Sequence, residues 1–451
     1  RHSEIRRLAR SYVTHLISQG YHPSFIRESA LSFFWYGSNR ISNDDALKDF
    51  FVTFPTDQSS YEVLFKVDRN FETLGDCFSG LEIFFSRTLP ADIDASSFPD
   101  FKNLRGEHLF AVVKDVEAKD IFSARERAES RLAIVATLQT IYRHSSLSRW
   151  NDYCLVKDVK SGTYRKVRKP RTAMQKRADP PPRLALTRLR ALGSVFSLEK
   201  DSFAKFHRSA QLHSMALGSD SQENQILNIW IALESLVPSE TKSNESSNIE
   251  HISSSLMSFL SISYIENLLG NLAKDLLRWN SRLTRALLKK VKGKKVEEKL
   301  ARMLIMEEYR EVRAELEVAT KDFYLLRDRL EYFKSTLSSP LSVANALDNH
   351  SKRLEWQIRR IYRARNIIVH SGRTPKYTRA LIEHAHDYLD TILTSLVTLA
   401  SKPKTINSVP QGFKFVQLRY SEYLRNLKEK GAAFDDENIE NLMFGLRRKD
   451  N

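Results

Sequence analysis

The sequence predicts a mainly α protein, in which an N-terminal α+β domain precedes a C-terminal helical bundle. Three observations lead to this prediction. Beyond about residue 195, apolar residues recur at three- and four-residue spacing, the period of a buried helix face. Short runs of aromatic and branched residues, typical of strands, occur before about residue 170. The length of 451 residues suits two or three domains.

The first predicted domain, residues 1–160, mixes helix and strand. The segment Ile5–Gln19 places apolar residues at helical spacing. Tyr61–Val67, Leu81–Phe85 and Leu109–Val113 are short, rich in aromatic and branched residues and bounded by turn-forming residues, so we expect three strands. This region contains no catalytic constellation, and we expect it to act as a sensor, regulator or partner-binding module.

The next expected elements are a helix and two strands. Helical spacing covers Ser123–Tyr142, where Ser123 can cap the helix and Glu126 follows three residues later, as in a capping box. Two short strands are expected over Tyr153–Val156 and Thr163–Val167. A Ser-Gly pair between them suits a hairpin turn.

A basic, proline-containing segment follows, and we expect residues 161–194 to connect the two domains. Pro170 and the three prolines at 180–182 exclude a continuous helix, which favours an extended connector. Two interpretations stay open: an arm that follows a phosphate backbone, or a solvated linker. In the first interpretation the candidate nucleic-acid contacts are Arg165, Lys166, Arg168, Lys169 and Arg171.

The second predicted domain, residues 195–402, is helical. The main helices are expected at Phe203–Ala216, Asn224–Leu236, Ile265–Leu277, Val296–Arg329, Leu347–His370 and Ala380–Ala400. The Ser- and Asn-rich segment Ser239–Asn248 is expected to be a loop, and residues 403–451 a short helical appendage. A second basic run is best interpreted as an exposed loop between helices. Its candidate nucleic-acid contacts are Lys289, Lys290 and Lys292.

Composition narrows the class of partner and the compartment. The formal net charge of +16 favours a polyanionic partner, because basic groups near phosphates release condensed counterions. No apolar run is long enough to span a membrane. The two cysteines, Cys77 and Cys154, form no CxxC pair, so we expect no disulfide framework or zinc site and a reducing cytoplasm. The first residue, Arg1, suggests that an N-terminal stretch is missing, and no signal-peptide core is present in what remains.

The candidates for chemistry are Arg365 and His370, near the end of a predicted helix. Their spacing alone is a weak signal, because the Arg-x4-His pattern occurs four times. We expect the other three pairs to be ordinary helix-surface neighbours: Arg10/His15, Arg208/His213 and Arg379/His384. His384 and His386 are expected on a solvated face, since acidic residues adjoin them. The motifs GxxxxGK[ST], HExxH and GxSxG are absent.

Helix geometry limits how these two residues can cooperate. A step of five residues turns a side chain by about 140° on an ideal helix. Arg365 and His370 therefore share one face only if the helix ends or distorts near His370, and Gly372 provides such an end. Asn366 and Arg363 do share a stripe with His370. This combination suits either the binding of a phosphate or a surface cluster of salt bridges.

Two segments resemble the Apea-like branch of the HEPN family. Arg365-Asn366-Ile-Ile-Val-His370-Ser-Gly is similar to the HEPN signature, an Arg followed by a polar residue and, a few positions later, a His. Upstream, Glu223-Asn-Gln-Ile-Leu-Asn-Ile-Trp-Ile-Ala-Leu-Glu-Ser-Leu236 looks like the first characteristic segment of the Apea-like group. The resemblance covers about residues 195–400 and implies a HEPN-type helical bundle.

The resemblance also implies an endoribonuclease that works as a homodimer without a metal or other cofactor. His370 would act as general base or acid on the ribose 2′-hydroxyl or the leaving 5′-oxygen. Arg365 would stabilise the charge on the phosphorane oxygens, and Asn366 would orient His370 or the phosphate. Arg363 and Glu234 would have supporting roles. The products would be a 2′,3′-cyclic phosphate and a 5′-hydroxyl.

Many members of this family are bacterial proteins that act against phage. The expected partners are therefore RNA, a second copy of the chain and a second protein of a defence system. The alternative function is a non-catalytic nucleic-acid-binding or scaffolding subunit of a defence complex. Arg365 and His370 discriminate between the two, because cleavage requires them and binding alone does not.

Overall fold

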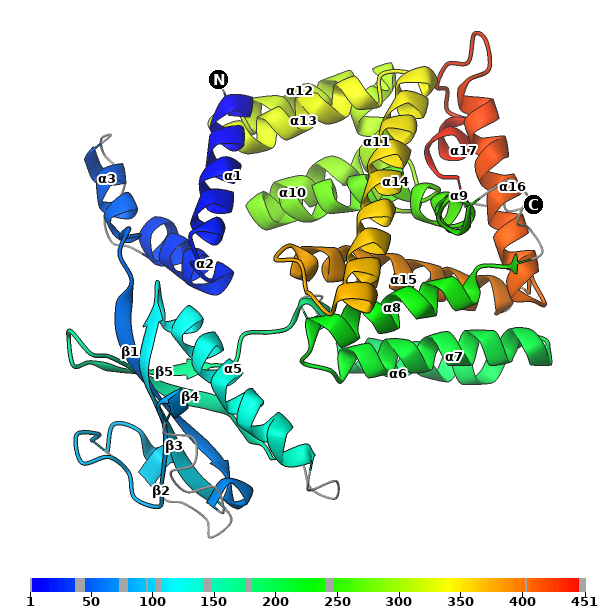
Figure 1. Cartoon of the computed structure of the whole chain (residues 1–451). Coiled ribbons are helices and arrows are strands. Elements are labelled where there is room, and N and C mark those ends of the chain that lie inside the picture. The colour runs from blue at the N-terminus through cyan, green and yellow to red at the C-terminus, as the bar shows by residue number, and fades with distance from the viewer. Residues whose placement is uncertain are drawn as a thin grey trace. The chain divides into compact units, whose positions relative to one another are not determined.

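The structure is a computed structural model that describes residues 2–36, 45–72, 80–94, 96–102, 108–141, 148–175, 181–239, 247–401 and 404–445. The chain divides into two compact units, Arg1–Pro170 (unit 1) and Arg171–Asn451 (unit 2). The predicted mainly α class is confirmed: unit 1 contains a small antiparallel sheet, and unit 2 is built from helices over its described residues (Figure 1). None of the described helices has both the length and the apolar composition that crossing a bilayer requires.

Unit 1 is organised around a five-stranded antiparallel sheet with the order β2-β3-β1-β4-β5. The strands are β1 (Ser59–Asp68), β2 (Ile83–Ser86), β3 (His108–Ala118), β4 (Trp150–Asp158) and β5 (Tyr164–Arg168). Each strand overlaps one that the sequence predicts. In the central strand, Phe65 lies opposite Ala111 on one side and Cys154 on the other, and all three are fully buried.

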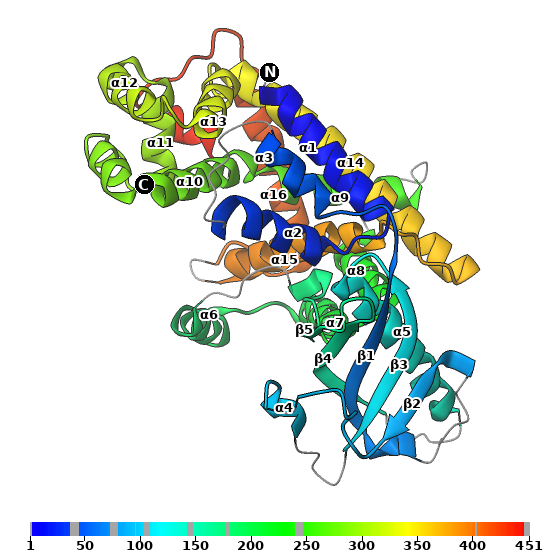
Figure 2. The ribbon, with the colours of Figure 1, turned by 90° about the vertical axis from the view of Figure 1, so that its left-hand side faces the viewer.

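One face of this sheet is covered by α5 (Ile121–Thr140), which packs on β1, β3 and β4 (Figure 2). The helix is capped by Asp120 and not by the expected Ser123. The Asp120 carboxylate accepts hydrogen bonds from the backbone N–H groups of Phe122 (2.8 Å) and Ser123 (2.9 Å). It also accepts one from the backbone N–H of His22 (2.8 Å), which ties α5 to the N-terminal helices. Burial raises the pKa of Asp120, although the hydrogen bonds favour its ionised form.

The N-terminal helices pack through aromatic side chains. They are α1 (His2–Ser18), α2 (Pro23–Leu31), the π-helical turn η1 (Ser32–Tyr36) and α3 (Asp45–Val52). A separate short helix, α4 (Pro99–Lys102), follows β2. Tyr21 stacks on Phe25 at 5.9 Å between ring centroids and meets the edge of Phe54 at 5.3 Å. Tyr21 and Phe54 belong to a small buried cluster of their own, and Phe25 packs against both this cluster and the core of the sheet.

The segment expected to be an extended connector, residues 161–194, is largely structured. Strand β5 completes the sheet of unit 1, and the 3-10 turn η3 (Ala173–Gln175) contributes two buried residues to the core of unit 2. Helix α6 (Pro182–Val195) then begins at Pro182. Proline is tolerated in the first turn of a helix, where its missing N–H has no partner to lose, so this proline starts a helix. Residues 176–180 lie outside the described part of the chain.

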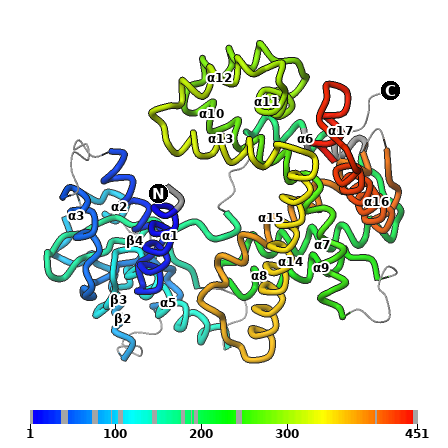
Figure 3. The backbone as a smooth tube through the Cα atoms, turned by 90° about the horizontal axis from the view of Figure 1, so that it is seen from above, coloured from blue at the N-terminus to red at the C-terminus, as the bar shows by residue number. Residues whose placement is uncertain are grey.

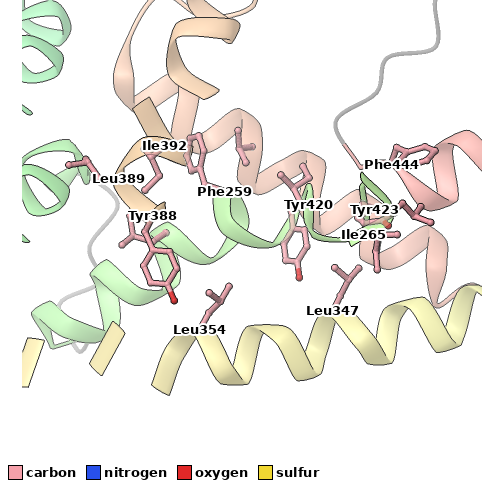
Figure 4. Packing of buried hydrophobic residues seen from close by; sticks show 14 of the residues in the cluster. Phe259, Ile265, Leu347, Leu354, Tyr388, Leu389, Ile392, Tyr420, Tyr423 and Phe444 are labelled. Atoms are coloured by element: carbon pink, nitrogen blue, oxygen red, sulfur yellow. The ribbon is translucent and has the colours of Figure 1, made fainter. Parts of the chain in front are cut away.

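Unit 2 has a continuous hydrophobic core that α14 (Pro340–Ser371) crosses. Figure 4 shows Leu347 and Leu354 of α14 pointing toward the layer that holds Tyr420. Packed on α14 are α8 (Gln222–Leu236), α9 (Asn248–Ser261), α10 (Tyr264–Lys289), α13 (Tyr324–Thr336), α15 (Thr378–Ala400) and α16 (Val409–Leu427). The unit also contains α7 (Lys200–Leu217), α11 (Val296–Ile305), α12 (Arg310–Ala319) and α17 (Ile439–Met443).

The single helix expected over Val296–Arg329 is instead a series of shorter ones. α11, the 3-10 turn η5 (Glu307–Tyr309), α12 and α13 fold back on one another and lie beside α10 (Figure 3). Met306 is extended (ψ 135°) at the first break, and at the second the Thr320 hydroxyl donates to the carbonyl of Leu316 (2.9 Å). Neither break contains Gly or Pro, so the usual sequence signals for a helix end are missing.

The expected appendage, residues 403–451, is described over residues 404–445, and these belong to the same core. α16 buries Phe413, and Phe444, which follows α17, is 2% exposed. Arg302 of α11 is also nearly buried, and its guanidinium binds the carboxylate of Asp436. Polar residues after 403 therefore cover the outside of packed helices, and one of them neutralises a charge on α11.

Candidate functional site

The candidate site lies at the C-terminal end of α14. The helix ends as the sequence predicts: Gly372 adopts a left-handed conformation (φ 65°), and its N–H donates to the carbonyl of Ile368 (2.9 Å). The inner face of α14 is a buried stripe formed by Leu354, Ile358, Ile361, Ala364 and Ile368. The remaining faces of the last three turns are left for polar side chains.

Arg365 and His370 lie on the same unbroken helix. α14 stays α-helical through Ser371, so the five-residue step separates the two side-chain directions by about 140° and their Cα atoms by about 7.5 Å along the axis. Arg365 is half-buried and His370 is exposed. The distortion that would bring them to one face within a single chain does not occur.

Asn366 lies between these two side chains on the helix surface. Its side-chain oxygen accepts a hydrogen bond from Nη1 of Arg365 (3.0 Å). Asn366 and Arg363 fall within about 40° of the direction of His370, so the expected polar stripe exists. The Nε atom of Arg365 is buried and has no hydrogen-bond partner among the described residues, which leaves one donor of this guanidinium unused.

The end of α14 carries positive charge that described carboxylates do not neutralise. Arg363, Arg365, Arg373 and Lys376 form no ion pair with any described residue. One turn further back, Arg359 differs, because it pairs with Glu355 (3.0 Å). Such a concentration of unpaired cations in unit 2 is suited to a polyanion.

A carboxylate from α8 holds the loop after α14 in place. Glu223 accepts hydrogen bonds from the hydroxyl of Ser221 (2.6 Å) and from that of Thr374. Burial raises the pKa of Glu223, but the two hydrogen bonds outweigh burial and leave this pKa below its ordinary value. Glu223 is therefore ionised and engaged at neutral pH, and it anchors the loop without neutralising the nearby cations.

The same helix α8 fixes the position of α14 through an aromatic contact. Trp230 is 1% exposed, and its ring lies 5.4 Å from that of Tyr362. Glu234, expected to support Arg363 or Arg365, is half-buried on α8 and forms no ion pair with either of them. The segment Glu223–Leu236 thus acts on the candidate site through Glu223 and Trp230.

Two exposed aromatic residues at this site were missed from the sequence. The guanidinium of Arg360 lies 4.6 Å from the ring centre of Trp356 and 5.0 Å from that of Tyr377. Trp356 is 60% exposed and Tyr377 40% exposed, so ring surface remains open to solvent. The four-residue spacing of Trp356 and Arg360 could be recognised in the sequence. The contact between Tyr377 and Arg360 could not, because it depends on how the loop after α14 folds back.

The basic residues of unit 1 are partly neutralised. Lys166 of β5 pairs with Asp100, and Lys169, just after this strand, pairs with Glu129 (3.0 Å). Arg165 and Arg168 remain exposed on this edge strand, and the Arg168 guanidinium lies 5.7 Å from the ring centre of Tyr153. Arg171, the first residue of unit 2, is exposed, and its carbonyl accepts a hydrogen bond from Arg379.

The basic run of unit 2 forms the expected loop between α10 and α11. Lys290 pairs with Glu315 (2.6 Å). Lys292 lies 3.6 Å from Glu308 and 3.8 Å from Asp436, and Lys289 is exposed. Internal carboxylates therefore compensate much of this run, in contrast to the end of α14.

Other residues singled out from the sequence lie in different surroundings than expected. His213 is not merely a neighbour of Arg208, since it contacts Asp390 of α15 (3.4 Å). His386 is 6% exposed and therefore not on a solvated face, whereas His384 is exposed. Cys154 is buried, which raises the pKa of its thiol to about 12 and makes it unsuitable as a nucleophile. Cys77 lies outside the described residues.

Searches of protein-family models, of curated proteins and of solved structures found no match for this chain.

Proposed function

We propose that the chain is a metal-independent endoribonuclease of the HEPN type, of the Apea-like branch, that cleaves RNA as a toxin-like effector in bacterial anti-phage defence. The observation that carries the proposal is the end of α14, which bears the Arg365–Asn366 pair, an exposed His370 and three further unpaired cations, Arg363, Arg373 and Lys376. Such a surface offers charge for a phosphate and an imidazole for proton transfer.

The reaction needs one base, one acid and one donor to the phosphate. His370 removes the proton of a ribose 2′-hydroxyl, and the 2′-oxygen attacks the adjacent phosphorus. The bond from phosphorus to the 5′-oxygen breaks, and that oxygen leaves with a proton from a second imidazole. Arg365 donates to the phosphorane oxygens, and Asn366 holds its guanidinium. The products are a 2′,3′-cyclic phosphate and a 5′-hydroxyl.

The angle between Arg365 and His370 supports a homodimer. Because the two side chains leave α14 about 140° apart, one chain does not direct both at the same phosphate. A two-fold axis beside the end of α14 would place Arg365 of one copy opposite His370 of the other. It would also supply the second imidazole that the acid step requires.

The exposed rings beside Arg360 fit a single-stranded substrate. Unpaired bases stack on aromatic side chains and on guanidinium planes, with a contribution of about 1–3 kcal/mol per base. Trp356 and Tyr377 offer such surfaces next to the cations that would contact the backbone. We assign these two residues to base stacking and Arg363, Arg373 and Lys376 to phosphate contacts.

The alternative is a non-catalytic nucleic-acid-binding or scaffolding subunit of a defence complex. The same divergence of Arg365 and His370 favours this function if the chain forms no dimer through α14. The unpaired cations serve both functions equally well. Unit 1 then has the same task in either case, as a cytoplasmic sensor or as the docking module for a second protein.

Cleavage of total RNA in EDTA separates the two functions. The wild-type chain is compared with His370→Ala and Arg365→Ala, and with His384→Ala as a control for an exposed histidine on α15. We expect cleavage to fall about 10²–10⁴-fold in His370→Ala and about 10²–10³-fold in Arg365→Ala, with products that end in a 2′,3′-cyclic phosphate. His384→Ala should cleave normally.

If the wild-type chain cuts no RNA, the assay is repeated with extract from phage-infected cells, which supplies a missing trigger. Continued absence of cleavage, together with equal RNA binding by the wild type and His370→Ala, would reject the nuclease and support the scaffold.

A further inference from the structure

Three side chains with metal-binding atoms meet between α7 and α15, and the proposed nuclease mechanism uses none of them. They are His213 of α7 and His386 and Asp390 of α15, and their ligand atoms all lie within 4.8 Å of one another. The Nε2 atom of His213 is 3.4 Å from Oδ1 of Asp390, and Nε2 of His386 is 3.5 Å from Oδ2. The two imidazole rings are 5.0 Å apart.

These distances suit coordination better than hydrogen bonding. A charge-assisted N–H···O bond is about 2.7–2.9 Å long, so 3.4 and 3.5 Å are long for direct contacts. Nε2 of His213 is in fact buried with no hydrogen-bond partner among the described residues. Around a tetrahedral zinc ion with bonds of about 2.05 Å, neighbouring ligand atoms are about 3.3 Å apart. Both measured distances lie close to this value.

Burial and charge also favour a cation at this place. The side chain of His386 is 7% exposed and that of His213 20% exposed, so the imidazoles are mostly shielded from water. Asp390 supplies a negative charge and is 23% exposed, which leaves a path from solvent.

We propose that His213, His386 and Asp390 bind one divalent transition-metal ion, of which zinc best matches two imidazoles and a carboxylate. The set contains three protein ligands, so the fourth position is open to water. The sequence predicted no metal site, because Asp390 follows His386 by four residues but His213 lies far upstream.

A bound ion would cross-link two helices that are distant in the sequence. α7 and α15 both pack on α8, the helix that supplies Glu223 and Trp230 to the end of α14. A bound ion would therefore fix the helices behind α8, and RNA cleavage in EDTA stays possible provided that the chain remains folded.

Cobalt(II) is the probe for this site, because tetrahedral Co²⁺ absorbs visible light more strongly than the hexaaqua ion. The full chain is stripped with EDTA, dialysed and titrated with Co²⁺, and Zn²⁺ is then added to displace it. We expect one Co²⁺ per chain, a visible absorption band, and loss of the band with one equivalent of Zn²⁺. His213→Ala and Asp390→Asn should each weaken binding at least about 100-fold, and His384→Ala, on the same helix, should not.

Thermal unfolding gives a second measurement that does not depend on activity. Zn²⁺ should raise the unfolding temperature of the wild type and of His384→Ala but leave those of His213→Ala and Asp390→Asn unchanged. Circular dichroism verifies that both variants are folded. The absence of a band in the folded wild type would overturn the proposal. So would equally tight Co²⁺ binding by His213→Ala and Asp390→Asn.

Discussion

The RNA-binding surface proposed at the end of α14 predicts a specific response of affinity to salt. Each phosphate contact to a single strand contributes about −0.7 to the slope of log K against log salt. Four contacts, from Arg363, Arg365, Arg373 and Lys376, give a slope of about −2.8. Affinity should then fall roughly 50-fold between 50 and 200 mM salt. The double variant Arg363→Ala/Arg373→Ala keeps two contacts, with a slope of about −1.4 and a roughly 7-fold loss over the same range.

Fluorescence anisotropy with a labelled single-stranded RNA measures these slopes over a salt series. Arg359→Ala is the matched control, because Arg359 lies on the same helix but is paired with Glu355. Its slope should equal that of the wild type, and so should that of Lys290→Ala, whose lysine pairs with Glu315. An unchanged slope in the double variant, or an equal reduction in Arg359→Ala, would refute the assignment of the polyanion site to the end of α14.

Three further predictions concern stability. Trp230→Ala empties a buried position against Tyr362 and should lower the free energy of unfolding, measured with urea, by about 3–5 kcal/mol. A loss below about 1 kcal/mol would contradict this packing. Asp120→Ala removes the cap of α5 and leaves three backbone N–H groups without this acceptor, so a loss of about 1–3 kcal/mol is expected, with the exposed Asp57→Ala as control. Burial disfavours the charged imidazole of His350 and lowers its pKa to about 4. His350 is therefore protonated in the unfolded chain before it is protonated in the folded chain, and the protein loses stability as the pH falls from 6.5 toward 4. His350→Phe should flatten this part of the curve of urea midpoint against pH, and an unchanged curve would exclude His350 as its cause.

Local sequence signals predicted most elements because their physical causes are local. The end of α14 at Gly372 needs only a residue that adopts positive φ. The 140° angle between Arg365 and His370 follows from helix geometry alone. In contrast, the breaks after α11 and α12 carry no Gly or Pro, and packing in three dimensions decides them.

Long-range contacts account for what the sequence could not predict. His213 meets Asp390, and Tyr377 returns to Arg360, only because the chain folds back on itself. Asp120 was missed as the cap of α5 although its type is favourable, because Ser123 and Glu126 imitated a capping box three residues later. The polar composition after residue 403 likewise concealed helices whose inner faces complete the core.

That C-terminal contribution to the core has a consequence for biosynthesis. Unit 1 ends at Pro170 and can fold while the ribosome still makes the rest of the chain. Unit 2 cannot close its core until Phe444 has emerged, which at ordinary rates of translation takes roughly 15–55 s after Arg171. During this interval α14 is already synthesised but lacks the helices that pack around it. The end of α14 therefore reaches its final packing only when synthesis of the chain is nearly finished.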